Sequence, residues 1–544
     1  MVLCCAVLVP MVAAVVVVAR ASWWHPGGDE ALISLHGWDL GRSPVPLGPY
    51  SRFGWDHPGP VLFWALSVPI RLVGDAGRGA AVGAVVVNSI AAVAAVWLVA
   101  RRVGPVAGAG MVGLIAVLTV TNPDGVWSVW NPYVTLLPFL AFVVACWGVA
   151  DSDVDAVPVA AIAGLFCIES HIGYASVVAS IAALAVVMAL VAWWRRGHHL
   201  PGRLTGAVLA ATAVVSAALA LPVVIDQTAG TGNFGQILSY FTRSGRQTSG
   251  LDEALGQLAR QLSPWGPWAG GREPSSIFGG EALPAPHLWL LVPLAAVVLA
   301  AALAWWRRDT TMLRLLSLIA VGATAGLWSV SSITPPAYPY LFVWLHVLGA
   351  LLWAAVLLTV ARALIPAHRH SDQHVPTGAT DQSQARRSVS TQRVALLVSI
   401  VVLALIPVAA AATNVARSQP PRAAAARAAD ALLPAALGAV APGDTFSISS
   451  DSPYTREAET IGAQLVEHGR QIVVDDDHAL AWGTQRLGDI NDPALVQLRL
   501  IVGNGPDPLV APDGWQLLAQ WDPATIDPST DPGNPLGLIT RTRA

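Results

Sequence analysis

The chain begins with an apolar stretch, Val2 to Ala19, that runs directly into Trp23-Trp24-His25-Pro26-Gly27-Gly28-Asp29-Glu30. A helix needs about 20 apolar residues to cross the hydrocarbon core of a bilayer, and this stretch is close to that length. Tryptophan rings favour the headgroup level, so the Trp pair marks the end of the predicted span. No basic segment precedes the stretch and no clear small-residue cleavage site follows it, so we expect a retained span rather than a signal peptide. Two adjacent carboxylates then lie where the membrane surface meets water.

Composition extends this prediction to the whole chain. Hydrophobic residues make up 54% of the 544 residues, and charged residues only 12%. Soluble globular proteins carry about 25% charged residues, so we expect a polytopic α-helical membrane protein. The formal net charge of −3 argues against a nucleic-acid partner. The four cysteines all fall in apolar stretches and show no disulfide or zinc pattern.

Apolar windows of suitable length predict about eleven spans. They lie near 2–20, 80–100, 105–121, 133–150, 156–170, 172–194, 204–225, 287–306, 311–330, 340–364 and 394–412. With these spans, the pairs Arg101-Arg102, Arg195-Arg196 and Arg307-Arg308 all fall on one side, which the positive-inside rule assigns to the cytoplasm. Residues 59–74 are apolar but short and bounded by Pro and Gly, which favours an interfacial or re-entrant helix. We therefore expect a multi-pass protein of the plasma membrane with its Asp29-Glu30 loop outside.

The sequence predicts four parts. Residues 1–366 form a transmembrane module, 367–393 a disordered cytoplasmic linker rich in Ser, Gln and Thr, and 394–412 the last transmembrane helix. Residues 413–544 are expected to form a small extracytoplasmic α/β domain. Strand patterns at 445–449, 471–474 and 498–502, with a helix pattern at 454–469, support this last assignment.

Polar side chains gather at the predicted outer ends of the spans. The candidates are Asp29, Glu30, Arg52, Asp56, His57, Asn131, Glu169, His171, Arg243, Arg246, Tyr338 and Tyr340. A carboxylate at such a place can take the proton of an attacking hydroxyl, and arginine suits a phosphate through paired hydrogen bonds. Simpler readings stay open: the two tyrosines as interfacial anchors, the two loop arginines at 243 and 246 as solvated charges, and Asp475-Asp476-Asp477-His478 as a solvated turn.

The order of these motifs resembles the GT-C glycosyltransferases that use polyprenyl-phosphate sugars, notably the protein mannosyltransferase and aminoarabinose transferase branch. The resemblance covers roughly residues 1–365 and rests on Asp29-Glu30 after the first span, Asp56-His57 before Pro58-Gly59-Pro60, the Arg101-Arg102 span end and Asn131-Pro132. It implies a GT-C-like catalytic module in which Asp29, beside Glu30, acts as general base or orients the acceptor.

The chain departs from the family pattern at two places. His57 stands where members carry lysine, which makes the predicted phosphate contact weaker and dependent on pH. Asn131 stands where many members carry aspartate, so a divalent metal stays an open alternative and no cofactor is assigned.

The leading prediction is an integral membrane glycosyltransferase that moves a hexosyl or pentosyl group from a polyprenyl-phosphate donor. The acceptor would be an extracytoplasmic cell-envelope glycan, lipid or protein. One alternative is a non-catalytic scaffold that binds a lipid-linked glycan. A flippase or transporter is disfavoured, because it would need ionisable residues near mid-span and related discontinuous helices.

Overall fold

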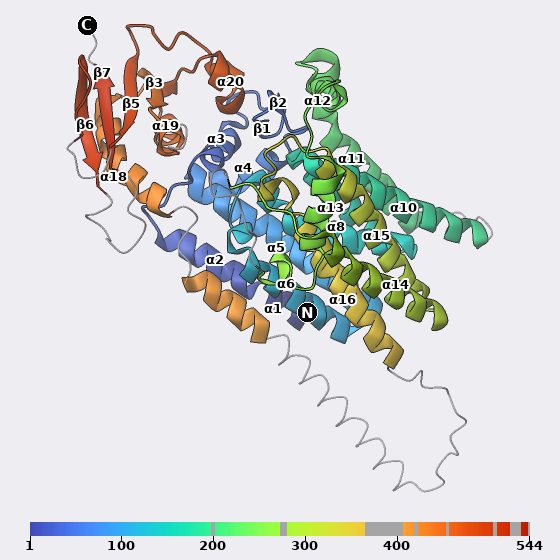
Figure 1. Cartoon of the computed structure of the whole chain (residues 1–544). Coiled ribbons are helices and arrows are strands. Elements are labelled where there is room, and N and C mark those ends of the chain that lie inside the picture. The colour runs from blue at the N-terminus through green and yellow to red at the C-terminus, as the bar shows by residue number, and fades with distance from the viewer. Residues whose placement is uncertain are drawn as a thin grey trace, which may run out of the picture.

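The computed structural model describes residues 1–196, 202–271, 280–364, 406–417, 423–452, 456–503, 509–522 and 535–541. These residues form a bundle of apolar helices and an α/β unit that lies at one end of the bundle (Figure 1). The predicted linker 367–393 lies outside the described residues. So does most of the predicted last span, 394–412, whose described part is helical together with the residues up to 417.

Eight helical segments of the described residues are long and apolar enough to cross a membrane. They are Val2–Arg20 (α1, Val2–Val7, and α2, Val9–Arg20), Ala76–Val103 (α5), Asn131–Ala150 (α7, Asn131–Val134, and α8, Leu136–Ala150), Ile172–Arg195 (η2, Ile172–Tyr174, and α10, Ala175–Arg195), Arg203–Ala229 (α11), His287–Trp306 (η4, His287–Leu290, and α14, Leu291–Trp306), Thr310–Ser331 (α15) and Leu345–Leu364 (α16). Three shorter apolar helices are α4 (Val61–Val73), α6 (Pro105–Thr121) and α9 (Ala156–Ser170). The chain is therefore a polytopic helical membrane protein, while the count of about eleven spans stays a prediction.

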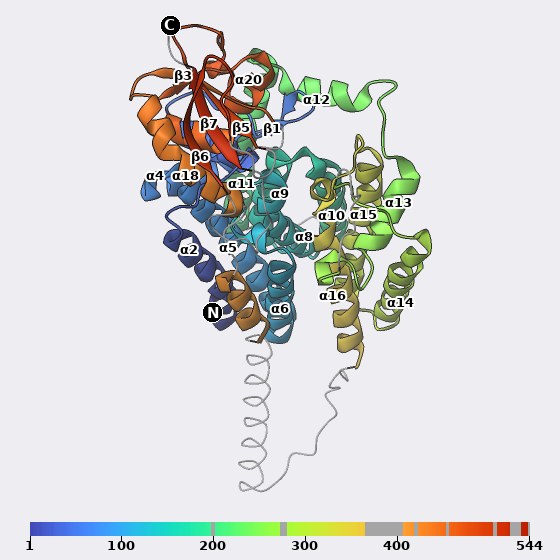
Figure 2. The ribbon, with the colours of Figure 1, turned by 60° about the vertical axis from the view of Figure 1, so that its left-hand side comes forward.

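Shorter elements connect the long helices. They are α3 (Asp29–Asp39), β1 (Tyr50–Ser51), β2 (Trp55–Asp56), η1 (Pro123–Val126), α12 (Asn233–Thr242), α13 (Gly250–Gln261), η3 (Pro267–Ala269) and η5 (Pro339–Phe342). The two short strands pair as an antiparallel hairpin, with Tyr50 opposite Asp56. Figure 2 shows α12 and the hairpin at the same end of the bundle as the α/β unit.

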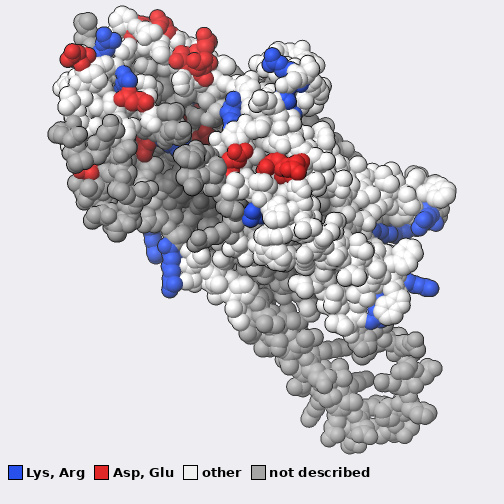
Figure 3. All heavy atoms as spheres, in the orientation of Figure 1, with Lys and Arg blue, Asp and Glu red and all other residues white. Residues whose placement is uncertain are grey.

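Two faces of the bundle can be told apart by their side chains. Arg102 and Arg314 both pair with Asp151, and Arg101 pairs with Asp153 and Asp155. These ion pairs connect the end of α5, the end of α8 and the start of α15. We call this side of the bundle the arginine face. The three aspartates of the loop 151–155 are thus all paired with arginines of this face. The opposite helix ends, which carry Asp29, are called the site face. On the side of the molecule in Figure 3, acidic side chains are visible over the α/β unit and also over the bundle near α13.

The segment after the first span was predicted as a loop, and that prediction was wrong. It is helix α3, with Asp29 and Glu30 in its first turn, where the helix dipole favours acidic side chains. Gly28 precedes the helix with φ 57°, a backbone angle that glycine adopts without strain. The helix packs on both sides: Ile33 joins the core around α4, whereas Leu32 and Leu35 join the core of the α/β unit.

The α/β unit contains a five-stranded sheet in the order β4-β3-β5-β7-β6. Its elements are α18 (Ala423–Ala439), β3 (Thr445–Ser450), α19 (Glu457–Glu467), β4 (Gln471–Ile472), α20 (Asp476–Trp482), η6 (Thr484–Arg486), β5 (Val496–Val502), β6 (Trp515–Trp521) and β7 (Leu536–Arg541). The strands β3, β4 and β5 run parallel, and β7 is antiparallel to β5 and β6. The predicted strands correspond to β3, β4 and β5, whereas α18, α20, β6 and β7 were not predicted.

A buried ion pair joins the α/β unit to the last turn of α3. Arg486 donates from Nη2 to Oδ1 of Asp39 at 2.8 Å, and its Nη1 lies 2.7 Å from Oδ2. The side chains of Arg486 and Asp39 are only 10% and 6% exposed. Beside this pair, Nε2 of His36 lies 3.0 Å from the carbonyl oxygen of Ala481. Paired contacts of this kind fix the orientation of one element on another.

We predict that Arg486→Ala lowers the thermal stability of the detergent-purified protein. The change leaves the Asp39 carboxylate buried without its cation, which typically costs about 3–5 kcal/mol. The matched control is Arg499→Ala, which breaks the more exposed pair with Asp451 in the same unit. An exposed pair contributes about 0–1 kcal/mol, so the control should shift the melting temperature far less. Equal shifts for both variants would show that the Asp39 pair does not join the two parts.

Candidate active site

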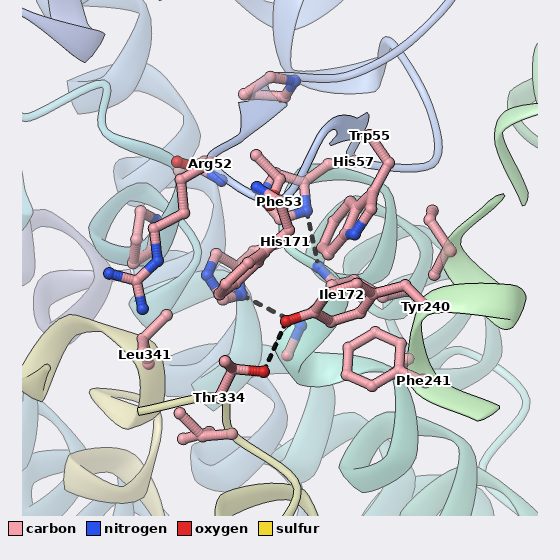
Figure 4. A pocket seen from close by; sticks show the side chains of 18 of the residues that line it. Arg52, Phe53, Trp55, His57, His171, Ile172, Tyr240, Phe241, Thr334 and Leu341 are labelled. Carbon is pink, nitrogen blue, oxygen red and sulfur yellow. Dashed lines mark hydrogen bonds between the residues drawn. The ribbon is translucent and has the colours of Figure 1, made fainter. Parts of the chain in front are cut away.

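A cavity of about 390 Å³ opens on the site face. Its wall is built from the first turn of α3, the β1–β2 hairpin, α7, η2, α12, the end of α15 and η5. Aromatic side chains make up much of this wall; they include Phe53, Trp55, Trp130, Phe234, Tyr240, Phe241, Trp328 and Tyr340. Figure 4 shows several of them around the two histidines of the cavity. A mostly apolar wall with a few polar groups is typical of a ligand site.

Asp29 is half-buried in the cavity wall. The hydroxyl of Tyr50, on β1, donates to Oδ1 of Asp29 at 2.6 Å. Burial, and then the charge of Asp29, raise the pKa of Tyr50 well above its usual value, so the phenol keeps its proton and remains a donor. The carboxylate is thus held in one direction by a hairpin that is far from it in sequence.

Of the predicted catalytic pair, Asp29 lines the cavity and Glu30 does not. Consecutive residues of a helix point in different directions, so Glu30 faces the interior of the bundle. It is 4% exposed and accepts a hydrogen bond from the hydroxyl of Ser128. Asp29 alone of the two carboxylates is placed to meet a ligand.

His57 and His171 lie stacked in the cavity wall, with ring centroids 4.9 Å apart. Each ring uses Nδ1 as an acceptor: His57 for the amide of Ile172 at 3.1 Å, and His171 for the amide of Gly173 at 3.2 Å. Burial lowers the pKa of His57 well below its usual range, and it lowers that of His171 to about 4. Both rings are therefore neutral near pH 7, with the proton on Nε2.

The acidic-basic pair implied by the family resemblance takes another form here. His57 lines the cavity as a neutral donor rather than as a cation, and the side chain of Asp56 does not line it. The backbone of Asp56 instead exchanges two hydrogen bonds with the side chain of Asn233, at 2.9 and 2.8 Å. Burial, together with the nearby charge of Asp226, raises the pKa of Asp56 to about 7. This segment fixes the start of α12 to the hairpin.

The three candidate arginines occupy different places. Arg52 lines the cavity, with its guanidinium over the rings of Phe53 and Tyr338 at 4.8 and 5.0 Å. Arg246 lies behind the wall, where its Nη1 donates to the carbonyl oxygen of Ser332 and the hydroxyl of Thr334 at 2.7 and 2.9 Å. Arg243 is exposed and does not line the cavity. Within the described part of the chain, Arg52 is the basic side chain of the cavity wall that carries a full charge.

Asn131 and Tyr340 line the cavity, whereas Tyr338 stacks behind Tyr340 with ring centroids 5.7 Å apart. Asn131 donates from Nδ2 to the carbonyl oxygen of Ser170 at 3.0 Å. Glu169 is 2% exposed, lies against Gly59 and does not line the cavity.

Among the described residues there is no group of three or more His, Cys, Asp or Glu that could hold a metal ion.

Several residues of the site were missed at the sequence level. Tyr50 and Ser128 hold the two acidic side chains, and α12 supplies Tyr240 and Phe241 to the wall. Of these, only α12 could have been predicted from the sequence, because its apolar residues recur at helical spacing. The contacts of Tyr50 and Ser128 depend on segments distant in sequence, which periodicity cannot reveal.

We predict that the melting temperature of His171→Asn falls less steeply on acidification than that of the unmodified protein. The pKa of His171 is lower in the folded protein than in the unfolded chain, so the unfolded chain binds the proton first as pH falls from 6.5 toward 4. Stability is therefore present above pH 6.5 and is lost below it, by up to about 1.4 kcal/mol per pH unit for one such group. Asparagine keeps an acceptor for the Gly173 amide and cannot titrate. Melting temperatures across this pH range test the change.

The control for this measurement is His478→Asn, which removes an exposed histidine of the α/β unit. This variant keeps the buried ring of His171, so its melting temperature should still fall on acidification. An unchanged slope in His171→Asn would contradict the assignment of a neutral, buried ring.

No family model matches the sequence, and no curated protein matches it. Two solved structures of ArnT from Cupriavidus metallidurans do resemble the chain. The apo structure has a TM-score of 0.53 at 13% identity, with 98% of each chain covered. The structure bound to undecaprenyl phosphate has a TM-score of 0.51 at 15% identity, with 97% of each chain covered. The chain therefore shares the fold of ArnT, a GT-C glycosyltransferase, along nearly its whole length.

Proposed function

We propose that the chain is an integral membrane glycosyltransferase that moves a sugar from a polyprenyl-phosphate donor to an extracytoplasmic acceptor. The observation that carries this proposal is the Asp29 carboxylate, held by Tyr50 at 2.6 Å in the wall of a largely aromatic cavity. The likeness to ArnT supports it, because one of the matched ArnT structures is bound to undecaprenyl phosphate.

The proposed reaction needs one base and one means of stabilising the leaving phosphate. A hydroxyl of the acceptor attacks the anomeric carbon, and a new C–O bond forms while the bond from that carbon to the phosphate oxygen breaks. The electron pair of the broken bond stays on the polyprenyl phosphate, and the hydroxyl proton passes to the Asp29 carboxylate. Proton transfer to a positioned side chain contributes about 10²–10⁴-fold to such a reaction. Tyr50 directs one oxygen of Asp29, which leaves the other for the acceptor.

Arg52 is the group best suited to the leaving phosphate. Its guanidinium carries a full charge at the cavity wall and can form paired hydrogen bonds with phosphate oxygens. The Nε2–H groups of His57 and His171 would add neutral donors, which need no change of protonation near pH 7. The aromatic wall would accommodate the sugar and the first isoprene units of the donor.

The site face would be extracytoplasmic and the arginine face cytoplasmic. The basic ends at Arg101-Arg102, Arg195-Arg196 and Arg307-Arg308 support this orientation through the positive-inside rule. The α/β unit would then lie outside the cell, beside the cavity, where it could contact a cell-envelope glycan, lipid or protein acceptor.

We predict that Asp29→Asn abolishes transfer by the purified protein, with a loss of about 10²-fold or more, while the protein level stays unchanged. Tyr50→Phe should cause a smaller loss of about tenfold, because it removes one hydrogen bond to a charged group. The measurement is consumption of synthetic polyprenyl-phosphate hexose or pentose in the presence of an envelope fraction. Asp252→Asn, which changes an exposed carboxylate on α13, is the matched control.

Full activity of Asp29→Asn would remove this residue as the base. Stoichiometric binding of the donor without any consumption by the unmodified protein would instead favour the scaffold reading.

A further inference from the structure

The first turn of α19, in the α/β unit, holds the backbone that leads into Asp29. The hydroxyl of Thr460 donates to the carbonyl oxygen of Pro26 at 3.0 Å. The amide of Gly28 donates to the carbonyl oxygen of Arg456 at 3.2 Å. Two hydrogen bonds at the start of α19 therefore hold both ends of the segment Pro26–Gly28, which directly precedes α3.

These contacts are buried and close. Thr460 is 3% exposed, and its hydroxyl also lies 3.1 Å from the carbonyl oxygen of Arg456 in its own helix. A Cβ added to Gly27 would meet the hydroxyl oxygen of Thr460 at 3.6 Å and Arg456 at 3.8 Å. The segment from Pro26 to Gly28 thus passes directly over α19, and little water can compete for these bonds.

The same segment sets the direction of the first turn of α3. The carbonyl oxygen of Gly28 accepts from the amides of Ala31 and Leu32 at 2.9 and 3.2 Å, and no side chain caps this helix end. The first turn of a helix has amides without helical partners and frays unless something else holds it. Here α19 holds the turn from outside, while Tyr50 holds the carboxylate of Asp29 from the cavity side.

We propose that α19 positions Asp29 for catalysis, with Thr460 as a positioning residue, so that the α/β unit is a working part of the active site. This inference rests on the proposed function, in which Asp29 is the base. A displacement of the catalytic carboxylate by about 1 Å can lower the rate about 10²-fold. The two hydrogen bonds just before the first residue of α3 limit such a displacement. The α/β unit would then act on the chemical step through the position of one carboxylate, without contacting the sugar.

The test is the variant Thr460→Val, which keeps the shape of the side chain and removes its hydroxyl. We expect kcat to fall about tenfold while KM for a synthetic polyprenyl-phosphate sugar stays the same, because Thr460 does not line the cavity. Thr460→Ser, which keeps the hydroxyl, should restore most of kcat. The matched control is Thr540→Val, because the buried Thr540 also donates to a backbone carbonyl, that of Gln497, within the sheet.

A second measurement reads the position of α3 without any activity. Hydrogen exchange followed by mass spectrometry should show faster exchange of the amides of Ala31 and Leu32 in Thr460→Val, and unchanged exchange there in Thr460→Ser and Thr540→Val. Faster exchange together with reduced kcat supports the proposal. Unchanged kcat, an equal fall in Thr540→Val, or reduced kcat without faster exchange would each overturn it.

The outcome is separable from that of the proposed function. Turnover by the unmodified protein that is lost in Asp29→Asn but kept in Thr460→Val would leave the glycosyltransferase intact and refute only the positioning role. Absence of turnover by the unmodified protein would refute both.

Discussion

The bilayer core contains no water to solvate a charge, and this constraint sorts the ionisable side chains of the chain to the two ends of its helices. At the arginine face the charges neutralise one another, as when Arg102 and Arg314 share Asp151. At the site face Asp29 lines a cavity and accepts a hydrogen bond from the neutral hydroxyl of Tyr50. The chemistry proposed for this protein depends on that difference between its two faces.

Burial also decides the protonation of the site. His57 occupies a position where the sequence favoured a weak cation, yet its buried ring, like that of His171, is neutral and is oriented by a backbone amide. Among the described side chains that line the cavity, the charged ones are therefore the anion Asp29 and the cation Arg52. A base and a phosphate-binding cation in one aromatic cavity are the minimum that transfer from a lipid phosphate requires.

Much of this architecture could be read from the sequence, and the exceptions have physical reasons. Long apolar windows predicted the eight helices that are long and apolar enough to cross a membrane, since the bilayer imposes length and polarity on each segment separately. Asp29 was found because its neighbours in sequence mark the membrane surface. Helix α3 was missed because its two packed faces belong to different cores, one around α4 and one in the α/β unit.

Contacts between distant segments lay beyond sequence reasoning. Asp56 and Arg246 were expected at the cavity but serve to hold α12 and the end of α15 behind it. The bonds from Thr460 to Pro26 and from Arg486 to Asp39 join residues more than four hundred positions apart. These bonds make the α/β unit and α3 one structure, so the carboxylate proposed as the base belongs to both parts of the molecule.

Native mass spectrometry in a mild detergent would show whether the cavity beside Asp29 holds a polyprenyl-phosphate lipid, as proposed. The protein would be measured as purified, and again after addition of a synthetic polyprenyl-phosphate sugar or of the same polyprenol without phosphate. We expect one phosphorylated lipid per chain and no retention of the free polyprenol, because Arg52 and the two histidine donors would recognise the phosphate. Ordinary phospholipid alone, persisting after the synthetic donor is added, would contradict it.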